Sequence, residues 1–145
     1  MMKLYLVVST IEQEGYIYYK WCLYNEDREL IFQSKNAETY ANIQQYIKIF
    51  TDIFSYVRKL SNDVLLYLKT NLQFMHKYFW RNCIIEELHY DDFAAFETLK
   101  NAMKDITPIK VIDGTEVKFL NTKEEMLLDQ LTQFVDACKK VDNGN

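Results

Sequence analysis

The order of the hydrophobic periodicities constrains this chain more than any other feature of its sequence. Three stretches rich in aliphatic and aromatic residues come first, separated by hairpin-length polar turns, and they predict three antiparallel strands at 3–10, 16–24 and 29–34. From 36 to 60, apolar residues recur at spacings of three and four, which predicts a long helix. Because two apolar stripes run along this helix, we expect it to be covered on two sides.

Past the long helix, the sequence predicts a strand and then shorter helices. Residues 64–68 form a continuous apolar run typical of an interior strand. A strand in this position, after a crossover helix, is expected to run parallel to the first strand. Helices are expected at 71–80 and at 92–106, the second ending ahead of Pro108 because proline disfavours helix in the residue before it.

Two interpretations stay open for residues 109–119. Asp113-Gly114 suits the two-residue turn of a hairpin, but it also suits the end of a fifth core strand that stops at Ile112. The pair Thr122 and Glu125 has the spacing of a capping box, which predicts that the last helix begins there.

Length and composition predict one domain over 1–141, with a frayed tail at 142–145 that carries no apolar anchor. The formal charge of −4 argues against a protein that binds phosphate groups over its whole surface, although it allows a local basic patch. Three widely spaced cysteines without metal-ligand spacing indicate reduced thiols and a cytoplasmic protein. No stretch is long enough to cross a bilayer, so no membrane partner is expected.

In order, the predicted elements read β-β-β-α-β-α-α-β-α, and this order resembles the ribonuclease H-like fold over residues 3–141. The resemblance implies an α/β protein with a five-stranded mixed sheet and helices on both faces. Strands one to three would be antiparallel, and strands four and five would be parallel. The similarity is one of element order and does not involve a sequence motif.

The resemblance also implies where a nuclease centre would lie. In that family, carboxylates hold two divalent metal ions that activate a water and stabilise the leaving oxygen. The first three acid positions would fall near Ser9, near Ile43 or Gln44, and near Lys69 or Thr70. Only Asp129, in the last helix, matches an acid of the family. Because one carboxylate cannot neutralise two divalent cations, we predict a scaffold without a metal site, cofactor or nuclease activity.

The opposing hypothesis is a divergent metal-dependent nuclease that acts on RNA or on an RNA–DNA hybrid. In it, Asp129 would work with acids placed elsewhere, such as Glu12, Glu14 or Asp63. The acidic run around His89 is a further metal candidate, made of Glu86, Glu87, Asp91 and Asp92. A solvated loop before a helix N-terminus explains that run equally well.

Residues 64–85 contain no acid, and their cations are interleaved with aromatic side chains, a mixture that suits nucleic acid. The candidate contacts are Lys69, His76, Lys77, Trp80 and Arg81. A helix with buried aromatic residues and solvated lysines would give the same pattern.

The strand at 16–24 is aromatic on both of its faces and provides the candidate contacts Tyr18, Lys20 and Trp21. The alternative is that the C-terminal helix covers the second face. Together these features predict a non-catalytic macromolecule-binding protein, with a protein partner favoured over nucleic acid because of the net charge and the aromatic surface material. A homo-oligomer built through the tyrosine-rich strand stays open. The small size and composition suit an accessory protein of a virus or mobile element.

Overall fold

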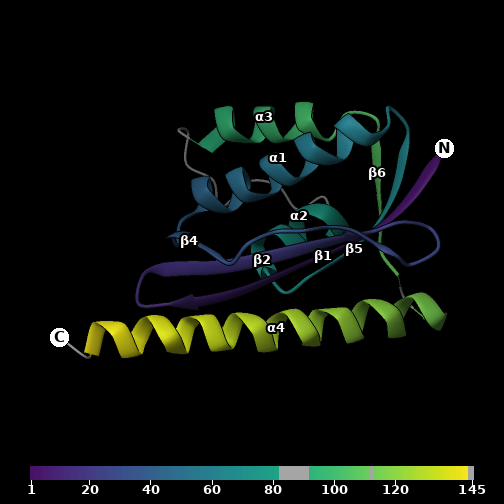
Figure 1. Ribbon diagram of the computed structural model, residues 1–145. Helices are drawn as coiled ribbons and strands as arrows, with labels where there is room; N and C mark the ends of the chain where they lie inside the picture. The colour runs from purple at the N-terminus through teal and green to yellow at the C-terminus, as the bar shows by residue number, and fades with distance from the viewer. Residues whose placement is uncertain (82–91, 112, 144–145) are drawn as a thin grey trace.

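A computed structural model describes residues 1–81, 92–111 and 113–143 of the chain. A mixed sheet lies at its centre, with α1 and α3 stacked over one face and α4 running along the other (Figure 1). In chain order the elements are β1 (Met2–Gln13), β2 (Tyr16–Tyr24), β3 (Leu30–Gln33), β4 (Ala37–Tyr40), α1 (Ile43–Leu60), β5 (Val64–Thr70), α2 (Gln73–Arg81), α3 (Phe93–Ala102), β6 (Ile106–Ile109) and α4 (Gly114–Asn143).

The sheet has the order β3-β2-β1-β5-β6, with β4 also paired to β2. β1, β2 and β3 are antiparallel, whereas β1, β5 and β6 are parallel to one another, as the sequence predicts. Glu14 and Gly15 join β1 to β2 with φ values of +53° and +84°, a left-handed turn that glycine adopts without strain.

β1 is apolar at successive positions because both faces of the sheet are covered. Leu4, Leu6 and Val8 belong to the larger core with α1, α2 and α3, whereas Tyr5 and Val7 belong to a smaller core with α4. We call these two sides the α1 face and the α4 face. Seven consecutive residues of β1, from Leu4 to Thr10, are buried between them.

Both apolar stripes of the long helix contribute to the core, as predicted, although Tyr40 is exposed and Tyr46, Tyr56 and Leu60 are only partly buried. Asn42 caps α1 by accepting a hydrogen bond from the Gln45 backbone N–H at 2.9 Å. One side of α1 lies over the sheet, and α3 packs against it, with Arg58 Nη1 donating to the Asn101 carbonyl at 2.8 Å. The buried residues of α1 are Ile47, Ile49, Phe50, Ile53, Phe54 and Val57.

The predicted start of this helix at residue 36 is wrong. Residues 37–40 instead form β4, antiparallel to β2, with Tyr16 paired to Tyr40. The three-residue spacing between Tyr40 and Ile43 continues the helical pattern by coincidence, and the helix begins only after the Asn42 cap.

The end of the next helix and the following strand also differ from the prediction. α3 ends at Ala102 rather than at residue 106, and Asp105 takes a left-handed φ of +69° before β6. β6 tolerates Pro108 because it is an edge strand, and its outer side has no neighbouring strand to hydrogen-bond.

Of the two interpretations of residues 109–119, the hairpin is wrong, whereas the fifth core strand exists as β6, parallel to β5, but occupies 106–109. β6 already ends at Ile109, Ile112 lies outside the described residues, and α4 begins at Gly114, where φ is +88°. The capping-box prediction is wrong too, because Thr122 lies inside α4 and its hydroxyl donates to the Lys118 carbonyl at 2.8 Å.

α4 continues through Asn143, so residues 142 and 143 of the predicted tail are helical, and 144–145 lie outside the described residues. Among the described helices, none combines the length and the apolar character that a membrane span requires.

Candidate functional site

β5 ends beside the middle of β1, where the nuclease centre would be expected. The parallel ladder between these strands ends at the pair Val8 and Thr70. Beyond it, the Asn71 side chain bonds Thr10 three times: Oδ1 accepts from the Thr10 N–H (2.9 Å) and hydroxyl (3.0 Å), and Nδ2 donates to the Thr10 carbonyl (2.8 Å). A neutral amide therefore extends the sheet at this end.

The positions at which the acids of the family were predicted to fall hold side chains that make other contacts. Ser9 is fully buried, and its hydroxyl donates to the Glu124 carbonyl of α4 at 3.4 Å. Thr70 is 4% exposed, and its hydroxyl accepts from the Leu72 N–H at 3.2 Å. Ile43 packs against the larger core and Gln44 is exposed, so neither offers an anionic oxygen to this end of the sheet.

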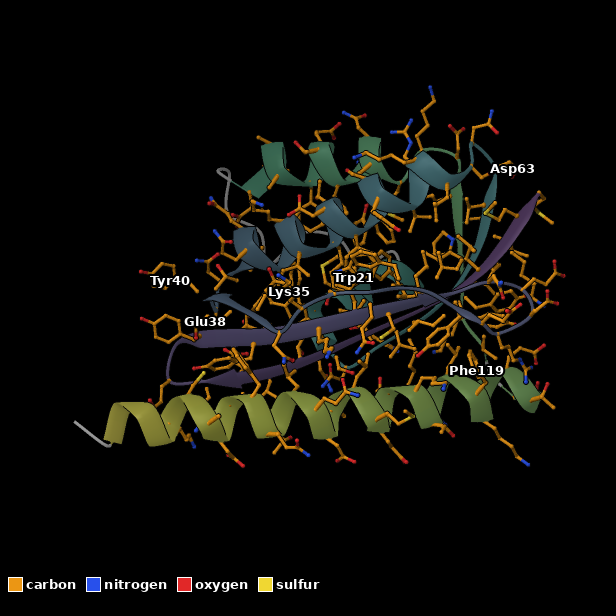
Figure 2. The ribbon with its side chains drawn as sticks, in the orientation of Figure 1. Trp21, Lys35, Glu38, Tyr40, Asp63 and Phe119 are labelled. Carbon is orange, nitrogen blue, oxygen red and sulfur yellow. The ribbon has the colours of Figure 1, made fainter. Side chains whose placement is uncertain are left out.

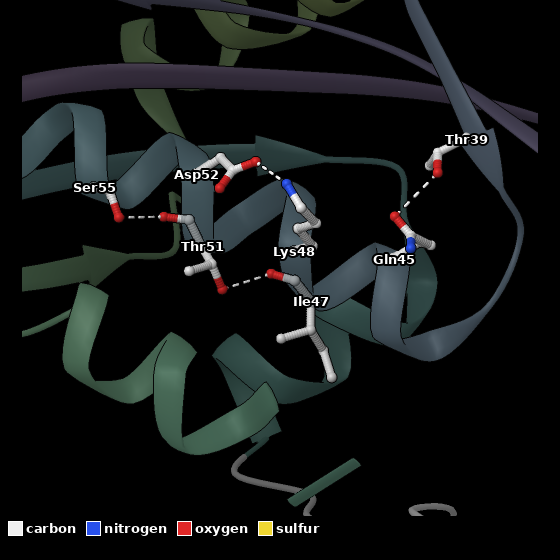
Figure 3. A network of polar contacts seen from close by, with 7 residues as sticks. All are labelled: Thr39, Gln45, Ile47, Lys48, Thr51, Asp52 and Ser55. Carbon is white, nitrogen blue, oxygen red and sulfur yellow. Dashed lines mark hydrogen bonds and ion pairs between the residues drawn. The ribbon is translucent and has the colours of Figure 1, made fainter. Parts of the chain in front are cut away.

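Polar contacts of α1 stabilise the helix itself (Figure 3). The Thr39 hydroxyl donates to the Gln45 amide oxygen at 3.0 Å, across the start of the helix. Lys48 Nζ donates to Asp52 Oδ2 at 2.9 Å, and both side chains are about two-thirds exposed. Asp52, the acidic residue of α1, is therefore paired at the surface with a lysine one helical turn away.

Asp129 lies on the outer side of α4. It is exposed, and it stands two residues from each of the buried Leu127 and Leu131, which places it on the opposite side of a 3.6-residue helix. Glu124 faces the sheet instead. Sequence reasoning missed Glu124, although its position between Leu120 and Leu127 on the buried stripe of α4 was a usable signal.

Glu124 is a half-buried carboxyl group with one unpaired oxygen. Burial raises its pKa above the ordinary value, Lys69 opposes that rise, and Glu125 adds to it. The buried Oε2 atom has no hydrogen-bond partner. Glu124 is thus a half-buried acid near the end of β5, and Lys69 partly balances its charge.

The other acids of the nuclease hypothesis do not gather around Glu124. Glu12 is exposed and bonds the Tyr46 hydroxyl, Glu14 is in the turn after β1, and Asp63 lies at the opposite end of the sheet, before β5 (Figure 2). Within residues 1–81, 92–111 and 113–143, no three His, Cys, Asp or Glu side chains are grouped so that they could hold a metal ion. His89 and the acids 86, 87 and 91 lie outside the described residues, and Asp92 is buried.

A cavity of about 220 Å³ opens on the α4 face beside this end of β5. We call it the cationic cavity. Its polar lining comes from β5, α2, the segment after β6, and α4, and consists of Lys69, Thr70, His76, Lys110 and Asn121. Aliphatic side chains complete the wall.

The cavity unites only part of the predicted basic segment. Lys69 and His76 line it, whereas Lys77 is exposed elsewhere on α2. Trp80 and Arg81 belong to α2, but their side chains lie outside the described part of the structure. Lys110 was missed because it comes from a distant part of the sequence, and no local pattern marks it.

The candidate contacts of β2 are not on an open surface. Trp21 is 9% exposed and packs between Phe32 and Tyr56, with ring-centroid distances of 4.7 and 5.6 Å (Figure 2). Lys20 is also 9% exposed, and the half-buried Tyr18 ring meets Phe134 of α4 at 6.1 Å. The expectation of an uncovered row on this strand is wrong, because α4 lies over it.

Solved structures similar to this fold are ribonuclease H-like. A foamy viral protease–reverse transcriptase, in complex with double-stranded DNA, matches with a TM-score of 0.57 and 12% identity, over 90% of this chain and 93% of that one. Ribonuclease H1 from Halobacterium salinarum matches with a TM-score of 0.57 and 11% identity, over 88% and 98%. A ribonuclease H1 isolated from compost matches with a TM-score of 0.59 and 11% identity, over 95% and 99%.

The similarity is carried by structure rather than by sequence. No family model matches this sequence, and no curated protein is similar to it at a significant level. At identities of 11 to 12%, the matches extend over nearly the whole chain and include its mixed sheet with helices on both faces. The protein therefore has a ribonuclease H-like fold.

Proposed function

We propose that this protein is a non-catalytic macromolecule-binding protein built on the ribonuclease H-like scaffold. The observation that carries the proposal is the amide of Asn71, bonded three times to Thr10 where β5 ends beside β1. Two divalent ions need several anionic oxygens at this place. Here the strand ends supply neutral groups whose hydrogen bonds are already used within the protein.

The electrostatics at the same end of the sheet support this proposal. Lys69 lies close enough to Glu124 to oppose the rise of its pKa. A lysine ammonium beside the single carboxylate partly neutralises it and repels a divalent cation. The site thus favours an anion over a metal ion.

The preferred partner changes when the side chains are placed in three dimensions. A protein partner was favoured because β2 was expected to expose aromatic residues, but Trp21 and Lys20 are buried. The cations Lys69 and Lys110 line an open cavity instead. We therefore propose nucleic acid as the partner, a choice supported by a similar structure that is a complex with double-stranded DNA. A role as a viral or mobile-element accessory protein stays a prediction from composition.

A divergent nuclease is the second candidate, favoured by one observation. Glu124 has a buried carboxylate oxygen without a partner, and it lies near the end of β5, where a metal ligand would be needed. The similar structures include ribonucleases H1, which gives this candidate a scaffold of the right kind.

Calorimetry with Mn²⁺ and a cleavage assay on a labelled RNA–DNA hybrid separate the two candidates. We expect no saturable heat and no Mn²⁺-dependent cleavage. Cleavage that is lost in Glu124→Gln but kept in Asp129→Asn would establish a nuclease centred on Glu124 and reject the non-catalytic proposal. Cleavage lost in Asp129→Asn would favour the nuclease first inferred from sequence.

Fluorescence anisotropy with single-stranded RNA, double-stranded DNA and the hybrid tests the partner class. We expect saturable binding that weakens as salt is raised. If the protein binds none of the three at low salt, a protein partner becomes the preferred hypothesis again. Light scattering on the same sample would detect a homo-oligomer.

A further inference from the structure

We propose that the cationic cavity binds one phosphate group of a nucleic-acid backbone, held between Lys69 and Lys110. The inference rests on the proposed function, because it specifies which site of the scaffold contacts the polynucleotide. It adds a binding site formed by residues that are far apart in the sequence.

The composition of the wall selects an anion. Lys69 comes from β5, His76 from α2 and Lys110 from the segment after β6, so cationic or protonatable groups approach the cavity from three directions. Among the described residues that line it, none is acidic. Glu124, which is not part of the lining, interacts with Lys69 and competes with a bound anion for that lysine.

The neutral groups of the wall suit phosphate oxygens. The Thr70 hydroxyl already accepts a hydrogen bond from the Leu72 N–H, so its own proton can be donated to a ligand. Asn121 is an exposed amide on α4 and adds N–H donors at the opposite side of the cavity. Hydrogen bonds to an ionised phosphate are stronger than those between neutral groups.

The size of the cavity limits what can enter it. Its volume of about 220 Å³ equals that of about seven water molecules at roughly 30 Å³ each. Pockets that enclose a whole drug-sized ligand usually measure about 300–1,000 Å³. A phosphate group fits the cavity with part of its hydration, whereas the sugar and base of a nucleotide would stay outside. This arrangement suits one phosphate of a longer chain.

The net charge of −4 adds a condition that the experiment can use. Because the negative net charge disfavours a polyanion overall, the local cations at the cavity should dominate both affinity and salt dependence. Removing one phosphate-contacting lysine is expected to lower the slope of log K against log salt by about one.

The test measures anisotropy of a short labelled single-stranded RNA over a salt series, with the full chain and four variants. Lys110→Gln is the principal variant, because Lys110 is exposed and its substitution should leave folding intact. Lys69→Gln removes the second lysine. Lys104→Gln and Lys59→Gln are matched controls, since both lysines are exposed and do not line the cavity.

We expect Lys110→Gln and Lys69→Gln each to weaken binding about tenfold and to lower the salt slope by about one, with the controls close to the parent chain. Inorganic phosphate and a nucleoside monophosphate serve as competitors. If only unlabelled RNA competes with the labelled RNA, the cavity binds a backbone phosphate. If inorganic phosphate competes equally well at a similar concentration, the cavity is a free-phosphate site and the polynucleotide assignment is overturned.

Two further outcomes are decisive. If the cavity variants behave like Lys104→Gln and Lys59→Gln, or if the parent chain binds no RNA, the phosphate site is rejected. If the cavity variants lose binding but the protein cleaves a hybrid with Mn²⁺, the phosphate site stands and the non-catalytic function fails. The two proposals can therefore fail separately.

Discussion

The two faces of the sheet are built from the same strands but differ in the size and polarity of the cores that they form. The α1 face is a continuous apolar core in which β1 and β5 pack against α1, α2 and α3. The α4 face has a smaller core that mixes Tyr5, Tyr24 and Phe119 with cations: Lys3 Nζ lies 4.8 Å from the Tyr67 ring centroid, and Lys123 Nζ lies 5.5 Å from that of Tyr24.

This difference arises from the two-residue period of a strand. In β1, Val8 points into the larger core, whereas the next residue, Ser9, faces α4 and uses its hydroxyl there. In β5, Leu68 joins the larger core and its neighbour Tyr67 packs against the smaller one, so these two residues divide in the same way. The cationic cavity at the end of β5 is lined by Leu68, Lys69 and Thr70. We infer that the α1 face provides most of the stability, and that the α4 face is able to keep polar groups for binding.

The largest effect should come from a large apolar side chain of the α1 face. Phe54 is fully buried and contacts both Phe50 and Phe79. Phe54→Ala is expected to lower the free energy of unfolding by about 3–5 kcal/mol, because it removes buried surface and leaves a cavity. Urea denaturation followed by circular dichroism measures this loss. A loss below that of the next variant would break the comparison between the faces.

Leu127 is the corresponding probe of the α4 face. It is 2% exposed and belongs to the smaller core. We expect Leu127→Ala to cost about 2–3 kcal/mol, near the low end for buried leucines, since the smaller core relaxes more easily around the missing side chain. The same denaturation series gives the value, and a cost equal to that of Phe54→Ala would mean that both faces are packed alike.

The third variant tests the polar end of the otherwise apolar α1 face. Asn71→Ala leaves the Thr10 N–H and carbonyl without the partner that continues the sheet. We expect a loss of about 1–2 kcal/mol, typical of a partly buried polar group deprived of its hydrogen bond. Asn62→Ala, in the exposed turn before β5, is the control and should change stability by less than about 0.5 kcal/mol. Equal effects of the two would show that the Asn71 contacts contribute nothing.

The smallest effect concerns the pH dependence of the α4 face. Since burial raises the Glu124 pKa above its unfolded value of 4.5, the folded chain binds the proton more tightly. Stability is therefore greatest below pH 4.5 with respect to this group, and falls as pH rises through the raised pKa. Glu124→Gln should remove this fall and be more stable than the parent at pH 7.

Thermal unfolding over a pH series measures the Glu124 effect, and Asp129→Asn is its control because Asp129 is an exposed acid of the same helix. An unchanged profile in Glu124→Gln would mean that the carboxyl is solvated. The variant should also strengthen RNA binding at the cationic cavity, because it frees Lys69 from a competing charge.

Much of the fold was predictable because hydrophobic period carries it. The aliphatic and aromatic run of β2 and the double apolar stripe of α1 are both clear in the sequence, and the element order followed from them. The four residues of β4 did not produce a signal, since the apolar spacing of α1 extended backwards through Tyr40. β6 was predicted too late in the sequence for a related reason, because Ile106 continued the apolar stripe of the preceding helix.

The candidate site was predictable only where its residues are close in sequence. Lys69 and His76 were identified from one basic segment, and both line the cavity. Lys110 and Glu124 join them through the path of the chain after β6, which no local pattern reveals. Trp21 and Lys20 were taken for surface residues because their burial depends on helices far along the chain.

The sequence by itself determined which segments are strand or helix and which residues of each share a side, because backbone geometry repeats locally with periods of 2 and 3.6. Only the tertiary structure decided which sides are covered and which distant charges meet. Burial and Coulomb energy depend on distance in space, and that distance is set when α4 packs against the sheet.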